Sequence, residues 1–479
     1  MIYDIVVGLE IHVELSTATK IFCGCKTTFG CPPNTNVCPV CMGYPGTLPV
    51  LNREVLNKAI EVGMATNCHI ASLTTFDRKN YFYPDNPKNY QISQLYNPIC
   101  KDGYVTINTA NGEKKIGIDN IHMEEDAGKL IHSETGGETL VDFNRAGVPL
   151  IEIVTEPDME SIYEVKEFLN KLRLCIQYTG ASDCKLNEGS MRVDVNLSVK
   201  KQGDKKLGVR TEMKNLNSIK AIEHAIDHEA KRQIAIIESG GRVESETRKW
   251  DENGQCSYLM RGKEDSRDYR YFPEPDIPAL SIDKKWLTDI RSRLSEQREE
   301  KMRRYKVQYN LPDYDIEVIT GNVLLLRLFE EAMQLMAEPK SVSNWLMGET
   351  IRIIRENGLS EDNLKISSKA LVTIIDLVKN GKINNTVAKR VYQEVIVNNV
   401  DPEEYIRENG LEQEKDAKKL TPVIQEVIKE NEQSVMDYRA GKTKAIGYLI
   451  GQTMKKMGGK ASPDIVSKIL IDLLEEKIY

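Results

Sequence analysis

The segment Gly8–Leu15 alternates apolar and charged side chains without a break, and this pattern constrains the fold of the 479-residue chain more than any other. Successive side chains of a β-strand point to opposite faces, so Glu10, His12 and Glu14 would share one face of a strand. A row of carboxylate, imidazole and carboxylate suits a divalent cation or a proton-transfer site. The same row would also fit an edge strand whose polar face is solvated.

Charged positions recur in further segments that resemble strands. These segments are Ile121–Lys129, Pro149–Pro157, Met191–Ser198 and Arg210–Asn215. An ordinary half-buried sheet rarely carries charged rows of mixed sign on several strands, whereas a polar cavity floored by a sheet does. The recurrence therefore favours a catalytic or metal-binding cavity over a solvated sheet face.

Length and composition indicate a soluble protein of two to four domains. The formal net charge of −7 argues against nucleic-acid binding by overall electrostatics, so a nucleic acid would need a local basic patch. No apolar run approaches the ~18 residues of a membrane span, and the amino terminus lacks the regions of a signal peptide. We therefore expect a cytoplasmic protein with no membrane contact.

The composition changes near residue 280. All ten cysteines lie at or before Cys256, and thirteen of the eighteen prolines lie at or before Pro278. From Asp283, a plausible N-cap, the apolar spacing becomes helical. The sequence predicts an α+β amino-terminal part followed by an all-helical part.

Two close cysteine pairs, Cys23 with Cys25 and Cys38 with Cys41, flank a loop rich in Gly and Pro. Paired thiolates on tight turns suit tetrahedral zinc, and a site with four thiolates has no open position for chemistry. Disulfides are disfavoured in a cytosolic chain, and a redox role for the second pair is the weaker alternative. Cys31 lies between the pairs and would be able to replace one ligand.

The most extended motif of the chain is FDRKNYFYPDNPK at Phe76–Lys88. Further motifs are Gly8–Leu15, His122–Lys129, Asp142–Glu152, Lys214–Ser218, Asp268–Asp276, Ser343–Gly348 and Gly441–Gln452. Together they resemble the motifs of the B subunit of the aspartyl/glutamyl-tRNA(Asn/Gln) amidotransferase. The resemblance spans the whole chain.

This resemblance implies three domains. A catalytic cradle similar to the glutamine synthetase fold, with the zinc loop, would occupy residues 1–290, a helical domain 291–405, and a YqeY-like, tRNA-binding tail 406–479. It also implies a ligase that forms carbon–nitrogen bonds with glutamine as amido donor (EC 6.3.5.-). The family forms a heterotrimer in which the partners are an amidase (the A subunit) and a small protein (the C subunit). ATP phosphorylates the side-chain carboxylate of Glu-tRNA(Gln) or Asp-tRNA(Asn), and ammonia channelled from the amidase displaces the phosphate.

The resemblance further implies site residues. The catalytic set would be Glu10, His12, Glu125 and Glu152, of which His12, Glu125 and Glu152 would bind Mg²⁺. Phosphoryl transfer also needs cationic side chains to hold the phosphates. The basic residues expected at ATP are Arg78, Lys79, Arg192 and Lys214.

A basic stretch lies near the carboxyl terminus, with no acidic residue from 441 to 460. The lysines expected to contact tRNA phosphates are Lys442, Lys444, Lys455 and Lys456. By charge alone, a solvated helix would explain this stretch equally well, and the resemblance favours tRNA.

Two other functions compete with the ligase. A tRNA adaptor without catalysis would not need clustered metal ligands, and a free-standing ligase for a small acid would not need a helical appendage with a basic tail. The chain also lacks a recognisable glutaminase signature, which agrees with ammonia supplied by a partner. The sequence leaves open which mischarged tRNA is used in the cell.

Overall fold

The computed structural model describes residues 3–133, 136–262, 268–359, 364, 366–414 and 416–475. The chain divides into two compact units, residues 1–298 and 299–479. The first contains a large sheet with helices and the second is helical, so the mixed α and β class of the chain is confirmed. None of the helices in the described ranges is long and apolar enough to span a bilayer.

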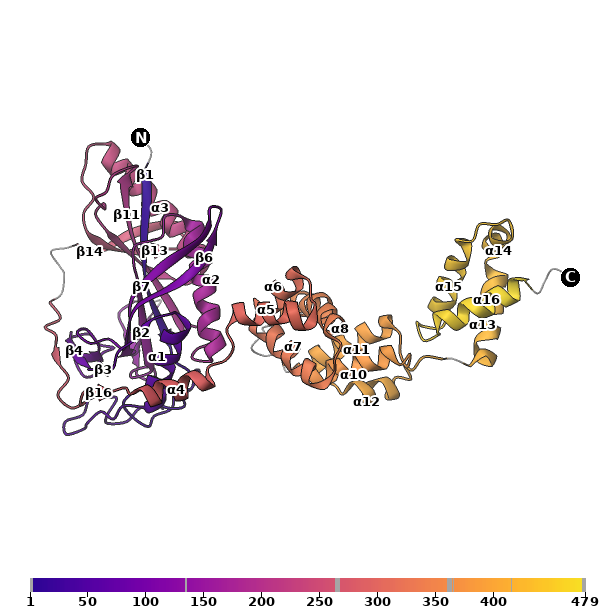
Figure 1. Cartoon of the computed structure of the whole chain (residues 1–479), viewed down its shortest axis with the longest axis horizontal. Helices are drawn as coiled ribbons and strands as arrows, with labels where there is room; N and C mark the ends of the chain where they lie inside the picture. The colour runs from indigo at the N-terminus through magenta and orange to yellow at the C-terminus, as the bar shows by residue number, and fades with distance from the viewer. Residues whose placement is uncertain are drawn as a thin grey trace. The chain divides into compact units, whose positions relative to one another are not determined.

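A nine-stranded sheet organises the first unit (Figure 1), in the order β14-β13-β12-β11-β1-β10-β7-β6-β2. Neighbouring strands are antiparallel except β12 and β13, which are parallel. The bounds are β1 Tyr3–Glu14, β2 His69–Ile70, β6 Cys100–Thr109, β7 Gly112–Glu125, β10 Pro149–Thr155, β11 Met191–Lys201, β12 Thr211–Leu216, β13 Glu246–Asp251 and β14 Cys256–Gly262. The alternating segment Gly8–Leu15 therefore lies almost wholly within β1, near the centre of the sheet.

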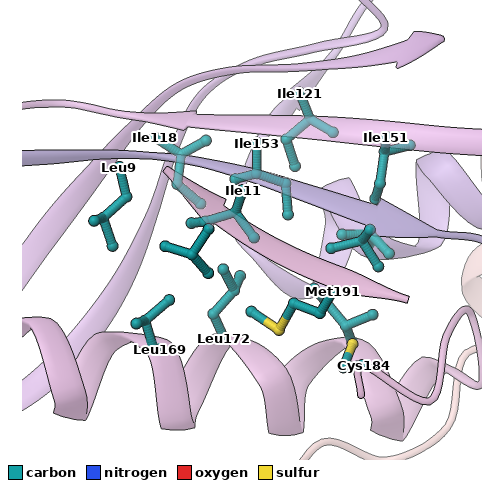
Figure 2. Packing of buried hydrophobic residues seen from close by; sticks show 14 of the residues in the cluster. Leu9, Ile11, Ile118, Ile121, Ile151, Ile153, Leu169, Leu172, Cys184 and Met191 are labelled. Carbon is teal, nitrogen blue, oxygen red and sulfur yellow. The ribbon is translucent and has the colours of Figure 1, made fainter. Parts of the chain in front are cut away.

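Three helices pack against the apolar side of this sheet. They are α1 (Arg53–Ala65), α2 (Ile162–Thr179) and α3 (Ile219–Glu238). The side-chain oxygens of Ser161 and Ser218 accept main-chain N–H bonds at the starts of α2 and α3. Figure 2 shows Leu169 and Leu172 of α2 beneath the buried side chains of the sheet. Glu10, His12 and Glu152, which alternate with buried apolar residues in β1 and β10, thus occupy the other face.

Short strands and one helix complete the first unit. β4 (Asp77–Asn80) lies between β5 (Tyr90–Ser93) and β15 (Phe272–Pro273), which brings the motif at 268–276 beside the motif at 76–88. The remaining elements are β3 Leu73–Thr74, β16 Leu280–Ser281, β8 Lys129–His132, β9 Thr139–Asp142 and α4 Lys284–Arg293. The Asp283 carboxylate accepts the Trp286 N–H at 2.7 Å, so the predicted N-cap is confirmed.

Helices joined by short connections make up the second unit in its described residues. Its helices are α5 Arg298–Tyr309, α6 Asp313–Thr320, α7 Val323–Leu335, α8 Pro339–Asn344, a π-helical turn Trp345–Thr350, α9 Ile351–Glu356, α10 Ser368–Lys379, α11 Asn385–Asn398, α12 Pro402–Glu408, α13 Ala417–Glu430, α14 Glu432–Arg439, α15 Ala445–Lys456 and α16 Pro463–Glu475. A core that includes Leu420, Leu449 and Leu470 joins α13, α15 and α16. The division of this unit at residue 405 stays a prediction.

Leu172 tests how much the α2–sheet core contributes to stability. Its side chain is fully buried, so Leu172→Ala leaves a cavity and should lower the free energy of unfolding by about 2–5 kcal/mol. Urea unfolding of the full chain, followed by circular dichroism, measures the change. Leu140→Ala is the control, because Leu140 is 64% exposed and its truncation should change the free energy by less than about 0.5 kcal/mol. Equal effects of the two substitutions would contradict this core assignment.

Candidate functional site

The register of the central strands brings charged side chains from three strands together. His12 on β1 is paired with Glu152 on β10, and Glu152 is paired with His122 on β7. Directly paired residues place their side chains on the same face of a sheet. Two imidazoles and a carboxylate therefore form one row across the middle of the polar face.

The row includes a second carboxylate, that of Glu124. The His12 Nε2 lies 3.4 Å from the Glu152 Oε2 and 3.6 Å from the Glu124 Oε1. The His122 Nε2 lies 3.2 Å from the same Glu152 oxygen. One ligand atom from each of His12, Glu124 and Glu152 lies within 4.8 Å of the other two, which is close enough for all three to bind one metal ion.

Glu125 was expected in this cluster, and the structure places it elsewhere. In the alternation of β7, Glu125 lies on the same face as the core residue Met123, whereas Glu124 lies on the same face as His122. The Glu125 carboxylate accepts the Ile92 N–H at 2.9 Å and pairs with Lys88. The position beside His12 and Glu152 that was expected of Glu125 is therefore occupied by Glu124. The alternation from His122 to Glu124 was the signal in the sequence that would have found it.

A second acidic group lies next to the first on the same face. Single carboxylate oxygens of Glu10, Asp194 and Glu212 lie within 4.8 Å of one another. The Lys214 Nζ is 2.6 Å from Asp194 and 2.7 Å from Glu212. Glu10 accepts a bond from the Asn196 amide at 2.9 Å, so it belongs to this neighbouring group and not to the His12 cluster.

Electrostatics reveal what the His12 cluster lacks. Burial disfavours charge on the His12 ring, but the hydrogen bond and charge of Glu152, with the charge of Glu124, raise the pKa of His12 to about 9. Burial opposes ionisation of Glu152, and the two histidines nonetheless hold the pKa of Glu152 well below its usual value. The second oxygen of Glu124 is buried and has no hydrogen-bond partner among the described residues. A divalent cation would supply that partner and displace the His12 proton, so the donor set fits a hard cation.

The four basic residues predicted at ATP have different surroundings. Against the effect of burial, the charges of Glu124 and Glu152 raise the pKa of Lys79, whose Nζ lies 5.1 Å from the centre of the Tyr269 ring. Lys79 therefore offsets the charge of Glu124 and Glu152, whereas Lys214 pairs with Asp194 and Glu212. Arg192 donates to Asp126 at 2.7 Å. Arg78 makes two bonds to Glu274, of 2.6 and 2.9 Å, which tie β4 to the segment after β15.

The four predicted zinc ligands converge. One sulfur atom from each of Cys23, Cys25, Cys38 and Cys41 lies within 4.8 Å of the others, and the Cys38–Cys41 separation is 3.9 Å. Sulfurs of a tetrahedral site with Zn–S bonds of ~2.3 Å are roughly 3.8 Å apart, so the four cysteines fit zinc. Cys31 is not among the four sulfurs that converge.

Lys20, which the sequence reasoning missed, lies beside this sulfur cluster. Its side chain is fully buried, and its Nζ is 3.6 Å from the Cys41 Sγ and 3.3 Å from the Phe143 carbonyl oxygen. A hydrogen bond from the Cys23 thiol, opposed by burial and aided by the charge of Lys20, lowers the pKa of Cys41 to about 4. The Lys20 ammonium thus places a positive charge beside the sulfur cluster, which favours the thiolate form of a cysteine ligand.

In the tail, acidic side chains pair with two of the four lysines of the predicted basic patch. The Lys442 Nζ lies 3.0 Å from Asp437, and the Lys456 Nζ lies 2.7 Å from Glu430. Lys444 and Lys455 form no ion pair with any residue that the structure describes. The absence of acidic residues from 441 to 460 in the sequence did not reveal these partners, because they come from α13 and α14.

Comparisons with known proteins match both units of the chain to domains of the same family. The GatB/GatE catalytic domain matches residues 5–288, and the GatB domain matches residues 327–474. The B subunit of the aspartyl/glutamyl-tRNA(Asn/Gln) amidotransferase of Agathobacter rectalis is 55% identical over 472 residues, which cover 98% of this chain and 99% of the relative. The protein of the same name in Lachnoclostridium phytofermentans is 53% identical over 475 residues, 99% of both chains.

The sulfur cluster leads to a prediction about metal content. We expect about one zinc per chain in the wild-type protein and a large loss in Cys41→Ser, because three thiolates and a hydroxyl bind zinc much more weakly. Plasma mass spectrometry of the dialysed proteins measures the zinc content. Cys256→Ser is the matched control and should keep its zinc, because Cys256 lies on β14 outside the cluster. Full zinc content in Cys41→Ser would contradict the assignment.

Proposed function

We propose that this chain, which belongs to the family of aspartyl/glutamyl-tRNA(Asn/Gln) amidotransferase B subunits, activates the side-chain carboxylate of a mischarged tRNA with ATP for amidation. The products would be Gln-tRNA(Gln), Asn-tRNA(Asn) or both. The observation that carries the proposal is the convergence of His12, Glu124 and Glu152, with Lys79 beside them, on the polar face of the sheet.

The chemistry accounts for this arrangement. A carboxylate is a poor acyl donor, and phosphorylation by ATP gives it a phosphate leaving group that ammonia can displace. Phosphoryl transfer depends on positioning and on neutralising the charge of the phosphates. We assign Mg²⁺ to His12, Glu124 and Glu152, where the ion would neutralise developing phosphate charge when bound. Lys79 and Lys214 would orient the phosphates, and Glu10 would position Asn196 and the neighbouring acidic group.

The predicted role of Glu125 changes under this assignment. Its carboxylate accepts a main-chain N–H and pairs with Lys88, so it would shape the pocket that it lines with Cys41 and Lys20. Arg78 would stabilise the loop motif through Glu274, and Arg192 would hold Asp126 close to the site. Zinc at the four cysteines would brace the loop without an open coordination position.

The remaining features of the proposal follow from the family. The name of the relatives implies an enzyme of several subunits, and we propose as partners an amidase (the A subunit), which supplies the ammonia, and a small protein (the C subunit). We further propose that the chain consists of a cradle similar to glutamine synthetase, a helical domain and a tRNA-binding tail. We also propose that it acts in the cytoplasm. Lys444 and Lys455 would provide the tail's phosphate contacts, since they lack acidic partners among the described residues.

Rapid quench-flow tests the proposed activation. The assembled heterotrimer is mixed with [γ-³²P]ATP and Glu-tRNA(Gln), or Asp-tRNA(Asn), without glutamine or ammonia. We expect phosphate on the side-chain carboxylate, and its formation should fall at least about 10-fold in Glu124→Gln, because a metal ligand matters at least as much as its supporting residues. Glu138→Gln, at an exposed position in the same unit, should behave as wild type.

Glu125→Gln distinguishes the two possible ligand sets. A loss in Glu125→Gln with full activity in Glu124→Gln would assign the cation to His12, Glu125 and Glu152 instead. If phosphorylation survives loss of His12, Glu124 and Glu152 together, the chain acts as a tRNA adaptor and the activating site lies in one of its partners.

The tail lysines give a separate prediction. Each phosphate contact lowers the slope of log K against log salt by about 0.9 for duplex nucleic acid. In the double variant Lys444→Gln, Lys455→Gln we expect the slope for tRNA to become shallower by about 1–2. Filter binding of tRNA to the complex at several salt concentrations measures it. Lys442→Gln with Lys456→Gln is the matched control and should change the slope less, because these lysines already have acidic partners. Equal slopes in the wild type and in both double variants would contradict the proposal that the tail contacts tRNA phosphates.

A further inference from the structure

The polar face of the sheet continues past the acidic groups to its edge. Lys214 on β12 is paired with Lys249 on β13, and Lys249 is paired with Tyr258 on β14. Paired residues share a face, so these three side chains extend the row that begins at Asp194, the partner of Lys214. The edge of the sheet thus carries a strip of two lysines and a tyrosine.

Contacts on both sides of β13 confirm this orientation. The Thr247 hydroxyl donates to the Glu212 carboxylate at 2.7 Å, which places Thr247 on the polar face. Arg248 approaches Glu229 of α3 at 3.8 Å, and the Trp250 ring lies 5.7 Å from that of His228, so both point to the helices. Lys249 lies between Arg248 and Trp250 in the sequence and therefore points away from α3.

The exposure of the strip is unusual for the edge of a sheet. Tyr258 is 57% exposed, and Lys249 is exposed and forms no ion pair with any described residue. Edge strands are normally protected by charges, and a large bare aromatic ring is a liability there. An aromatic ring next to a cationic group without an ion pair is a combination that binds nucleotides, because the ring stacks on a base and the cation meets phosphate.

We infer that Tyr258 and Lys249 bind an adenosine phosphate, with the base on the Tyr258 ring and a phosphate at Lys249. This inference rests on the proposed function, which brings adenosine to this face both as ATP and as the 3′-terminal adenosine of tRNA. Three strand spacings, about 14 Å, separate β11 from β14. A chain of phosphates that begins at Lys249 would therefore extend past Lys214 toward the acidic groups.

Binding by the full-length chain tests the inference, with Mg-ATP and with tRNA that carries or lacks its terminal adenosine as probes. Stacking of one base on an aromatic ring raises affinity about 5- to 150-fold, so Tyr258→Ala should weaken binding by that factor and Tyr258→Phe should restore it. Lys249→Gln should weaken the same ligand and make its salt dependence shallower. Leu259→Ala is the matched control, because Leu259 is 58% exposed on the same strand and is paired with Arg248 on the helix side.

The pattern of losses identifies the source of the adenosine. Weaker binding of Mg-ATP assigns the strip to ATP, whereas weaker binding only of tRNA with its terminal adenosine assigns it to the tRNA end. If Tyr258→Ala binds all three probes as Leu259→Ala does, the inference is overturned and the proposed function stands. If Tyr258→Ala weakens ATP binding and the wild-type complex forms no acyl phosphate, the proposed function fails and the nucleotide site stands.

Discussion

The hydrogen-bonded register of β1 with its two neighbours is the constraint on which the rest of the first unit depends. β1 lies between β10 and β11, and its pairing places Glu10 opposite Asp194 and His12 opposite Glu152. A slip of one residue would send His12 into the core and Ile11 to the polar face. The buried positions of Leu9, Ile11 and Val13 make such a slip costly, so the apolar core under the sheet fixes the charged site above it.

The sheet therefore stabilises a group of charges that would not assemble on their own. Burial next to like charges disfavours carboxylates, and the pKa of Glu10 is raised first by burial and then by the charge of Glu152. Lys79 and Lys214 offset part of this repulsion. The unpartnered oxygen of Glu124 shows that the described residues alone do not complete the compensation. A site of this kind gains stability when a cation binds, and at the cysteine loop the buried Lys20 ammonium lies beside the Cys41 sulfur.

Much of the fold and of the candidate site could be predicted from the sequence, because local residue patterns specify them. Alternation predicted β1 and its charged face, spacing predicted the four converging cysteines, and the change near residue 280 predicted the helical second unit, whose boundary lies at residue 298. Strand alternation also contained the position of Glu124, but the family motif drew attention to Glu125. Acidic partners of Lys442 and Lys456 were beyond reach, because sequence distance says little about which helices of a bundle are neighbours.

The sequence by itself determined the central strand β1 and its charged face, the helical character of the second unit, and the family to which the chain belongs. These properties depend on side-chain periodicity and on motif identity, and both are local. Only the tertiary structure decided which strands are neighbours, and therefore that Glu124 joins His12 and Glu152, that Glu10 joins Asp194 and Glu212, and that Lys20 lies against Cys41. Strand order and register arise from long-range hydrogen bonds and the shared core, which no local pattern specifies.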